Sequence, residues 1–480
     1  MLFFLGFLLV WPVWMRGGTR PEWMGPVPWL ALAALGSALF WPDRERVENA
    51  RAARMRALHG FLSDSLLYVG LAFLLLLSLQ VWNGPRNLEW NSTLGFWFFA
   101  PPPRPNLPVF SIRPSEAAEM LLWFGPAFAS ILAIRHGLSR ERKAELLRLL
   151  AVNAAWVAAV GLIQQASHAP GIFWRGEAEA PFFATFGYTN HAGAYFVLAS
   201  ILSGGLLIRE LGHDDGGENV GWALPTLLIN LMGALFCRSR AAIALAALLS
   251  ILGSGYALRR LRRRYTTAGR AAVTICLVAV LATAAFVFVR VPGNVVREEW
   301  KGTTLDAARS RVERRGDPYL DAAWQIWRDH PWFGVGGWGY RHYVPLFVVP
   351  DNPNRVFPVG SANVHNDPLQ FLVEFGAVGV GLLVLAVLLL LRPSARTLAS
   401  LSRRRRDGES RSFLYRIPPL GLALLVGPAV IFLYSFADLP FRSPAVLWLW
   451  FTMLACAPDF LEHRPSSTEK VAVTPGKQVG

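Results

Sequence analysis

Charge and cysteine are both scarce in this chain of 480 residues. Only 16% of the residues are charged, whereas a soluble globular protein carries about a quarter. Cys237, Cys276 and Cys456 are odd in number and lack the spacing of metal ligands, so neither a disulfide framework nor a zinc site is expected. The N-terminal run, "MLFFLGFLLVWPVWMRGG", lacks a preceding basic region and a clear cleavage site, which favours a first span over a signal peptide.

Apolar residues are abundant instead. They make up 53% of the chain, and several runs reach the ~18 to 20 residues needed to cross a bilayer. The sequence therefore predicts an all-α, polytopic membrane protein with about twelve transmembrane helices and one long loop. The expected spans lie near residues 2–15, 26–41, 61–82, 115–134, 146–168, 191–208, 221–237, 241–258, 271–289, 367–391, 417–436 and 444–458.

The basic residues predict how these spans are oriented. With the N-terminus inside, the inner loops and the tail carry 28 of the 47 Lys and Arg residues, and the short outer loops carry nine. The other ten lie in one long outer loop, 290–365. Because cytoplasmic loops are enriched in Lys and Arg, basic runs such as "RRLRRR" (259–264) read as orientation signals and lipid headgroup contacts rather than as a nucleic-acid site.

The predicted spans and their orientation divide the chain into three segments. Residues 1–180 form N-terminal transmembrane helices, and residues 181–458 form a second transmembrane unit that includes the loop 290–365. Residues 459–480 are polar, contain Pro and Ser, and are predicted to be a disordered cytoplasmic tail. No internal repeat is visible, which argues against a transporter built from inverted repeats.

Unusual polar stretches from distant parts of the chain fall on the same, outer side. They are "FGYTNHAG" (186–193), "CRSRAA" (237–242), the loop 290–365, "HNDPLQ" (365–370) and "ADLPFRSP" (437–444). Their common sidedness follows from the span count alone. The outer side is therefore the expected functional side.

The stretch "VHNDPLQFLVEFGAVGVG" (364–381) places a titratable imidazole at a helix entrance. Asp367 and Pro368 read as the N-cap and N1 positions, because Asp accepts from free amides and Pro loses nothing at N1. His365 then lies just outside the helix, where the amides and the dipole favour an anion. His365 is a general-base candidate, and a structural histidine is the alternative. Glu374 lies inside the span, where a carboxylate needs a partner on another helix or a functional role.

Two arginines interrupt an otherwise apolar stretch. Arg238 and Arg240 fall at the membrane boundary, where a guanidinium must be paired or hydrated. They form either a turn with arginines that reach towards the headgroups, or an anion clamp suited to phosphate. Arg240, at the start of the following helix, is the stronger candidate for the clamp.

The long loop contains an aromatic segment. Residues 319–330 have apolar groups at helical spacing, including Trp324 and Trp327, which predicts an amphipathic helix with its aromatic face on the membrane. "GVGGWG" (334–339) is predicted to be a turn, because no strand precedes it and no P-loop lysine follows it.

Taken together, the motifs resemble those of the O-antigen ligase and O-antigen polymerase superfamily of bacterial membrane glycosyltransferases. The similarity covers roughly residues 180 to 450 and is carried, in order, by "ATFGYTNHAGAYFVLA", "SRAAIALAALL", "DAAWQIWRDHPWFGVGGWGYRHY", "HNDPLQFLVEFGAVG" and "SFADLPFRSPA". Tyr188 and Thr189 depart from the Asn-Pro that is common in the family, and Pro368 stands where a bulky residue often follows.

The resemblance implies a reaction and a place for it. It implies an enzyme of the bacterial inner membrane that transfers a glycan, without metal or other cofactor, from undecaprenyl diphosphate to a sugar hydroxyl at the periplasmic face. The acceptor would be lipid A-core or another glycan. No Asp-x-Asp pair is present to hold a divalent ion, so cationic side chains would neutralise the leaving group.

The resemblance also implies site residues. His365 and Arg240 are the expected catalytic residues. The expected substrate-binding or supporting residues are Arg314 or Arg315, Asn190, His191, Asn366, Glu374, Asp438 and Arg442.

The sequence leaves two functions open within the superfamily and two functions outside it. A ligase and a polymerase break the same bond, so the sequence separates them poorly; the signature favours the ligase. A lipid or glycan transporter, or a structural membrane subunit, would carry out no bond chemistry.

Overall fold

The structure is a computed structural model. It confirms that the chain is predominantly helical, as the sequence predicts. It describes residues 1–41, 50–85, 88–91, 96–99, 101–177, 181–211, 220–261, 278, 319–347, 363–403 and 416–461. Helices dominate these residues, and one short antiparallel hairpin pairs β1 (Leu88–Asn91) with β2 (Phe96–Phe99).

The helices follow the apolar runs of the sequence. Their bounds are α1 Leu2–Trp14, α2 Val27–Phe40, α3 Ala50–Leu62, α4 Ser65–Trp82, α5 Pro114–Gly137, α6 Arg140–Ala166, α7 Thr189–Glu210, α8 Val220–Phe236, α9 Arg240–Leu261, α13 Tyr340–Tyr343, α14 Asp367–Arg403, α16 Pro419–Tyr434 and α17 Pro444–Phe460. Residues 319–329 are also helical, and short 3₁₀ turns such as η7 (Pro440–Arg442) join the longer elements.

Six of the described helices are long and apolar enough to cross a membrane: α4, α5, α6, α7, α9 and α14. The shorter apolar helices are α1, α2, α8, α16 and α17. The expected span 271–289 and most of the loop 290–365 lie outside the described residues, so the count of twelve stays a prediction.

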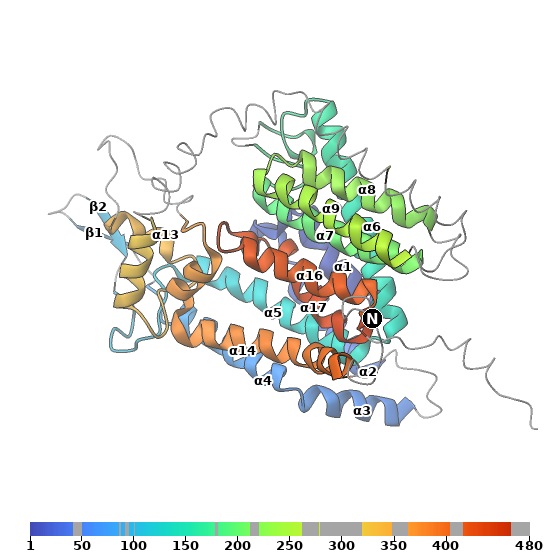
Figure 1. The fold of residues 1–480 in the computed structure, drawn as a ribbon. Coiled ribbons are helices and arrows are strands. Elements are labelled where there is room, and N and C mark those ends of the chain that lie inside the picture. The colour runs from blue at the N-terminus through green and yellow to red at the C-terminus, as the bar shows by residue number, and fades with distance from the viewer. Residues whose placement is uncertain are drawn as a thin grey trace, which may run out of the picture.

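The helices form one bundle with two distinct ends (Figure 1). We define the site end as the helix ends and connections near residues 14–18, 82–85, 110–114, 166–177, 181–189, 236–240, 363–367 and 434–444. Contacts join these segments: Ser443 Oγ donates to the Gly17 carbonyl at 2.8 Å, and Gln165 Nε2 donates to the Phe236 carbonyl at 2.8 Å. In Figure 1 this end lies beside α13 and the β1–β2 hairpin.

Ion pairs connect the helices at the opposite end of the bundle. Asp64 caps α4 and lies 2.9 Å from Arg135 Nε, and Lys143 Nζ lies 2.5 Å from Asp459. Arg135 and Lys143 both belong to the predicted inner loop 135–148, so this is the end that the sequence predicts to face the cytoplasm.

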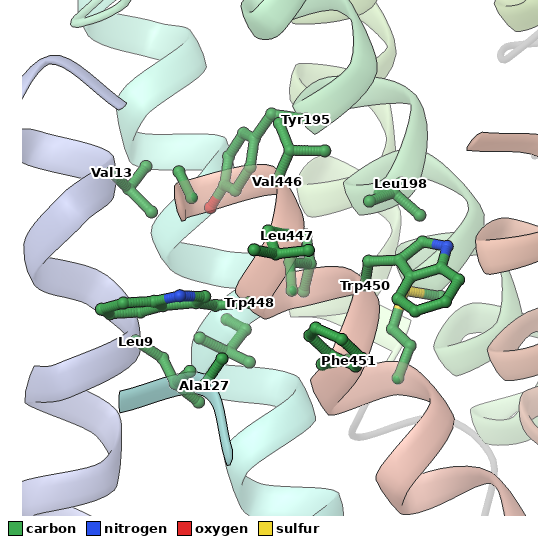
Figure 2. Close-up of a cluster of buried hydrophobic side chains, with 14 of the residues drawn as sticks. Leu9, Val13, Ala127, Tyr195, Leu198, Val446, Leu447, Trp448, Trp450 and Phe451 are labelled. Carbon is green, nitrogen blue, oxygen red and sulfur yellow. The ribbon is translucent and has the colours of Figure 1, made fainter. Parts of the chain in front are cut away.

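The C-terminal helix α17 is the centre of the bundle. Most of its residues are buried, and Figure 2 shows Trp448 and Phe451 packed among side chains of α1, α5 and α7. Both of its indoles are satisfied: Trp448 Nε1 donates to the Trp123 carbonyl at 2.9 Å, and Trp450 Nε1 donates to the Pro428 carbonyl at 2.8 Å. Because α17 begins at the site end, this packing fixes the segment 435–443 that precedes it.

Helix α14 is broken near its start. Gly376 has φ 64° and ψ −176°, so residues 367–375 form a separate helical piece. The break exposes backbone groups, and the segment 331–336 pairs with them: Val335 N donates to the Val373 carbonyl at 3.0 Å, and Ala377 N donates to the Pro331 carbonyl at 2.8 Å. The Gln80 side chain of α4 donates to the Glu374 carbonyl at 3.1 Å. The backbone groups freed by the break therefore have partners within the protein.

The helix 319–329 is present as the sequence predicted, and it packs on the protein through one face. Its buried residues are Ala322, Ala323 and Ile326, which contact a small apolar cluster that includes Val335 and Tyr340. Trp324, expected on the membrane-facing stripe with Trp327, is 44% exposed beside this buried face. The small residues allow close approach to the segment 331–344. The expected contact of the aromatic face with the membrane stays a prediction. The turn predicted at 334–339 is present and is the segment that enters the break in α14.

Candidate functional site

His365 stands at the entrance to α14 in a strained conformation. Its φ is 55°, which residues other than glycine seldom adopt, and its side chain is 38% exposed. Its Nδ1 atom faces Asp438 Oδ1 at 3.5 Å, and Asp438 is nearly buried, with its side chain 8% exposed. A carboxylate facing Nδ1 favours the tautomer in which Nε2 is free to accept a proton.

Asp438 is held by donors from several parts of the chain. Tyr434 Oη donates to Oδ2 at 2.9 Å, Tyr188 Oη donates to Oδ1 at 3.1 Å, and the Asn190 amide also donates. The backbone amide of Leu439 completes the set at 2.8 Å. These donors, from several parts of the chain, hold the carboxylate in a fixed position beside His365.

The same contacts keep Asp438 ionised. Burial by itself raises the pKa of its carboxyl group, but the hydrogen bond and charge of His365 and the surrounding donors outweigh burial. The pKa of Asp438 is therefore below its ordinary value. A fixed negative charge beside His365 stabilises an imidazolium when the ring takes up a proton.

The start of α9 lies against the start of α7 beside this carboxylate. Ser239 is buried and precedes Arg240, and its Oγ accepts from the Ala242 amide at 3.4 Å, as an N-cap residue does. A Cβ on Gly193 would lie 2.6 Å from the Ala242 Cβ atom, so only glycine permits this approach. Two helix N-termini, with Arg240 at one of them, thus lie side by side near Asp438.

Arg238 and Arg240 differ in exposure. Arg238 is exposed with φ 63°, and Arg240 is half-buried as the first residue of α9. The structure places Arg240 at a helix N-terminus, where the dipole and the guanidinium both favour an anion.

The cap of α14 is one residue earlier than the sequence predicted. Asn366 Oδ1 accepts from the Leu369 amide at 3.0 Å, so Asn366 is the N-cap and α14 begins at Asp367. The Asp367 carboxylate instead accepts from the Phe441 amide at 2.7 Å. Asp367 therefore ties α14 to η7 instead of capping its own helix.

Gln370 connects the helix back to His365. Its Oε1 accepts from the Val364 amide at 3.1 Å, and its Nε2 donates to Asn363 Oδ1 and Glu374 Oε1, both at 3.0 Å. The backbone on the N-terminal side of His365 is thus held by a side chain from inside α14.

Glu374 and Arg442 are paired with each other inside the protein. Arg442 Nη1 lies 2.8 Å from Glu374 Oε2, and their side chains are 2% and 0% exposed. The Arg442 guanidinium also lies over the rings of Trp338 and Phe371, at 4.8 Å and 4.7 Å from their centroids. Neither side chain reaches the surface, so both support the site rather than meet solvent there.

The structure brings together many of the residues that the sequence singled out. His365, Asn190 and Asn366 lie around Asp438 and the α14 entrance, and Arg240 begins the adjacent α9. His191 is buried, with Nε2 2.9 Å from the Leu439 carbonyl, so it holds the segment that carries Asp438. Arg314 and Arg315 lie outside the described residues. The roles assigned to all these residues stay predictions.

Sequence reasoning missed the two tyrosines. Tyr188 and Tyr434 both donate to Asp438, although Tyr188 had been noted only as a departure from the family pattern. Tyr434 ends an apolar helix and resembles an interfacial tyrosine, so nothing in its local sequence marks it. Tyr434 precedes Asp438 by four residues, and this spacing is the sequence feature that could have indicated their contact.

Backbone strain concentrates at the site end. In the described part of the chain, the residues other than glycine with positive φ are Arg16, His168, Phe173, Trp174, Ala184, Arg238, Trp338 and His365. All of them belong to the site end or to the segment 331–344 that packs on it. Such strain is commonly retained where function requires a fixed geometry. No group of three or more His, Cys, Asp or Glu side chains that could hold a metal ion occurs among the described residues.

Comparison with protein families agrees with the sequence motifs. Residues 225–386 match a family model described as O-antigen ligase. The matched range contains Arg240, His365 and Glu374 and ends before Asp438 and Arg442. The resemblance to the O-antigen ligase superfamily is therefore confirmed. Among curated proteins, none matches the chain at a significant level.

Proposed function

We propose that this membrane protein, whose residues 225–386 match the O-antigen ligase family, transfers a glycan from undecaprenyl diphosphate to a sugar hydroxyl. The observation that carries the proposal is the pair formed by His365 and Asp438, 3.5 Å apart, at the bundle end where α9 presents Arg240. The basic residues at the opposite end support a periplasmic location for the site in the inner membrane.

The proposed step is a single displacement. The acceptor hydroxyl oxygen attacks the anomeric carbon as its proton passes to Nε2 of His365, and the bond from that carbon to the diphosphate oxygen breaks. The configuration at the carbon inverts. Asp438 keeps the proton of Nδ1 in place and stabilises the imidazolium that forms.

The leaving group carries the negative charge that must be neutralised. Arg240 and the N-terminus of α9 are the described groups suited to a diphosphate, because both offer N–H donors and positive charge. Arg314 or Arg315 is proposed as a second cation from the long loop. Asn190 and His191 are proposed to support this side of the site, and transfer without metal or cofactor is part of the same proposal.

The buried residues have a supporting role in this proposal. Asn366 caps α14, and the Glu374–Arg442 pair fixes Gln370, which holds the approach to His365. Their substitution is expected to act through the position of His365 rather than through lost substrate contacts.

A gel of surface glycans and lipid-linked glycans tests the proposal. Cells that lack this chain are complemented with wild type, His365→Ala or His168→Ala; His168 is an exposed histidine at the same end and serves as the control. We expect wild type and His168→Ala to restore the glycan, and His365→Ala to accumulate in the membrane without restoring it.

The pattern of the stranded product identifies the reaction. Long chains left on the lipid carrier beside bare lipid A-core support the ligase. An acceptor that carries a single repeat unit instead supports a polymerase of the same superfamily. An unchanged glycan profile in cells without the chain, or full rescue by His365→Ala, contradicts the proposed chemistry and favours a transporter or a structural subunit.

A further inference from the structure

Tyr188 lies at the start of α7, beside the carboxylate that faces His365. Its hydroxyl donates to Asp438 Oδ1 at 3.1 Å and lies 3.4 Å from Oδ2. Oδ1 is also the oxygen that faces Nδ1 of His365, at 3.5 Å. The same carboxylate oxygen therefore meets both the phenol of Tyr188 and the imidazole of His365.

The directions of the surrounding bonds follow from the available protons. The Asp438 carboxylate can only accept, so the Tyr188 proton points to it. The Asn190 amide donates to Tyr188 Oη at 2.9 Å, and it donates to Asp438 Oδ2 as well. The reverse orientation of this amide would place its carbonyl oxygen against the carboxylate. Tyr188, Asn190 and Asp438 thus form a closed ring of hydrogen bonds, and such networks strengthen their members cooperatively.

The phenol ring is also fixed by packing. His191 meets the ring of Tyr188 edge-on, with 4.8 Å between the ring centroids and 86° between the ring planes. His191 Nε2 lies 2.9 Å from the Leu439 carbonyl, and the Leu439 amide donates to Asp438 Oδ1 at 2.8 Å. The start of α7 therefore holds residues 438 and 439 through several side chains.

We propose that Tyr188 is a positioning residue whose hydroxyl holds Asp438 Oδ1 towards Nδ1 of His365. Asn190 orients this hydroxyl through its own hydrogen bond. The inference rests on the proposed function and adds to it a residue that lies outside the matched family segment, 225–386. It gives the entrance of α7 a part in the reaction, because Tyr188 acts through Asp438 rather than on the substrates.

These contacts predict a change in rate rather than in binding. Tyr188→Phe removes only the hydroxyl, and we expect kcat to fall about tenfold, the effect of one lost hydrogen bond to a charged group. The KM values for donor and acceptor should each stay within about twofold, because the phenol acts through Asp438 and His365 on the transition state. In an Asp438→Asn background, Tyr188→Phe should lower kcat by less than about twofold, because the carboxylate that Tyr188 positions is already absent.

Tyr195→Phe is the matched control. Tyr195 belongs to the same helix but lies in the buried core that Figure 2 shows, so loss of its hydroxyl should leave kcat within about twofold of wild type. The rates are measured with purified protein, using lipid-linked glycan and acceptor extracted from cells that lack this chain. Size-exclusion profiles in detergent show that each variant is folded.

Asn190→Ala is the second test. It keeps the phenol but removes the amide that donates to Tyr188 and to Asp438, so kcat should again fall while both KM values stay unchanged. If Tyr188→Phe is not folded, the rate of Asn190→Ala decides the inference.

The outcomes separate this inference from the function beneath it. If His365→Ala is inactive but Tyr188→Phe and Asn190→Ala keep the wild-type kcat, the phenol does not direct Asp438 and the inference is wrong. It is also wrong if Tyr188→Phe lowers kcat as much in the Asp438→Asn background as in wild type. If Tyr188→Phe instead raises the KM of one substrate and leaves kcat unchanged, Tyr188 binds that substrate and is not a positioning residue. If His365→Ala retains full activity, the proposed function itself fails.

Discussion

Arg442 and Glu374 form an ion pair that is closed to solvent, with 2.8 Å between Nη1 and Oε2 and side chains that are 2% and 0% exposed. The guanidinium lies between the rings of Trp338 and Phe371, so aromatic faces replace part of its lost hydration. The pair joins η7 to the first turns of α14. It therefore fixes the helical piece that carries His365 at its entrance.

Removing one member of this pair should be costly. Arg442→Met leaves two buried carboxylates, Glu374 and Asp367, without their cation, and Glu374→Leu leaves the guanidinium with only the more distant Asp367 Oδ1, 3.5 Å from Nε. Each change should destabilise the protein by about 3 to 5 kcal/mol, because an uncompensated buried charge remains. The measurement is the thermal unfolding midpoint in detergent, followed by size-exclusion chromatography.

The double variant distinguishes charge from packing. Arg442→Met combined with Glu374→Leu removes both charges of this pair but leaves Asp367 without Arg442, so we expect it to recover part of the loss. If the double variant lowers the unfolding midpoint by the sum of the two single-variant decreases, the ion pair is not the source of the effect.

Gly376 is required by the break in α14. A Cβ there would lie 2.3 Å from the backbone of Trp332, at a φ of 64° that side chains disfavour. We expect Gly376→Ala to prevent accumulation of folded protein in the membrane. Gly381 is the matched control in the same helix, because a Cβ there meets nothing within 4 Å, and Gly381→Ala should be neutral or slightly stabilising. Equal accumulation of the two variants would show that α14 can be continuous.

Gln370 should affect activity more than stability. Gln370→Ala removes the bonds that hold Asn363 and Val364, so the backbone before His365 loses its support. We expect glycan transfer to fall by about tenfold while the protein still accumulates. Gln165→Ala is the control, since Gln165 also binds a carbonyl at the site end, at 2.8 Å, but contacts neither His365 nor Asp438. The two variants should differ clearly in the amount of glycan transferred per folded protein.

The negative charge of Asp438 should be required for glycan transfer. Asp438→Asn keeps the shape but presents an amide to Nδ1 of His365, and we expect transfer to fall at least about 100-fold. Asp438→Glu tests whether the charge alone is sufficient, and should restore less than wild-type activity because its longer side chain misplaces the carboxylate. Wild-type rates in Asp438→Asn would remove Asp438 from the mechanism.

The low pKa of Asp438 also predicts a pH dependence of stability. A carboxylate with a depressed pKa stabilises the fold at pH values above its unfolded pKa, 3.8, and that contribution is lost as the pH falls through its folded pKa. The difference in unfolding midpoint between wild type and Asp438→Asn should therefore shrink as the pH falls below about 5. A difference that stays unchanged in stronger acid would show that the Asp438 carboxylate does not supply this contribution.

The sequence by itself determined the class of the protein and where many of its spans lie. The predicted spans 115–134 and 191–208 correspond to α5 and α7, because a bilayer requires long apolar runs that can be recognised locally. The basic loops predicted the orientation for a similar reason. The motifs around Arg240 and His365 also carried the family resemblance, which the matched segment confirmed.

Only the tertiary structure decided how the motifs act together. His365 meets Asp438 across 73 positions of sequence, and Glu374 meets Arg442 across 68. No local pattern predicts such pairs, because a hydrogen bond depends on the positions of two segments that the bundle brings together. The break at Gly376 was likewise hidden in an apolar run that reads as a continuous helix. Its backbone groups found partners in the segment 331–336, of which only residues 334–336 belong to the turn predicted from the sequence.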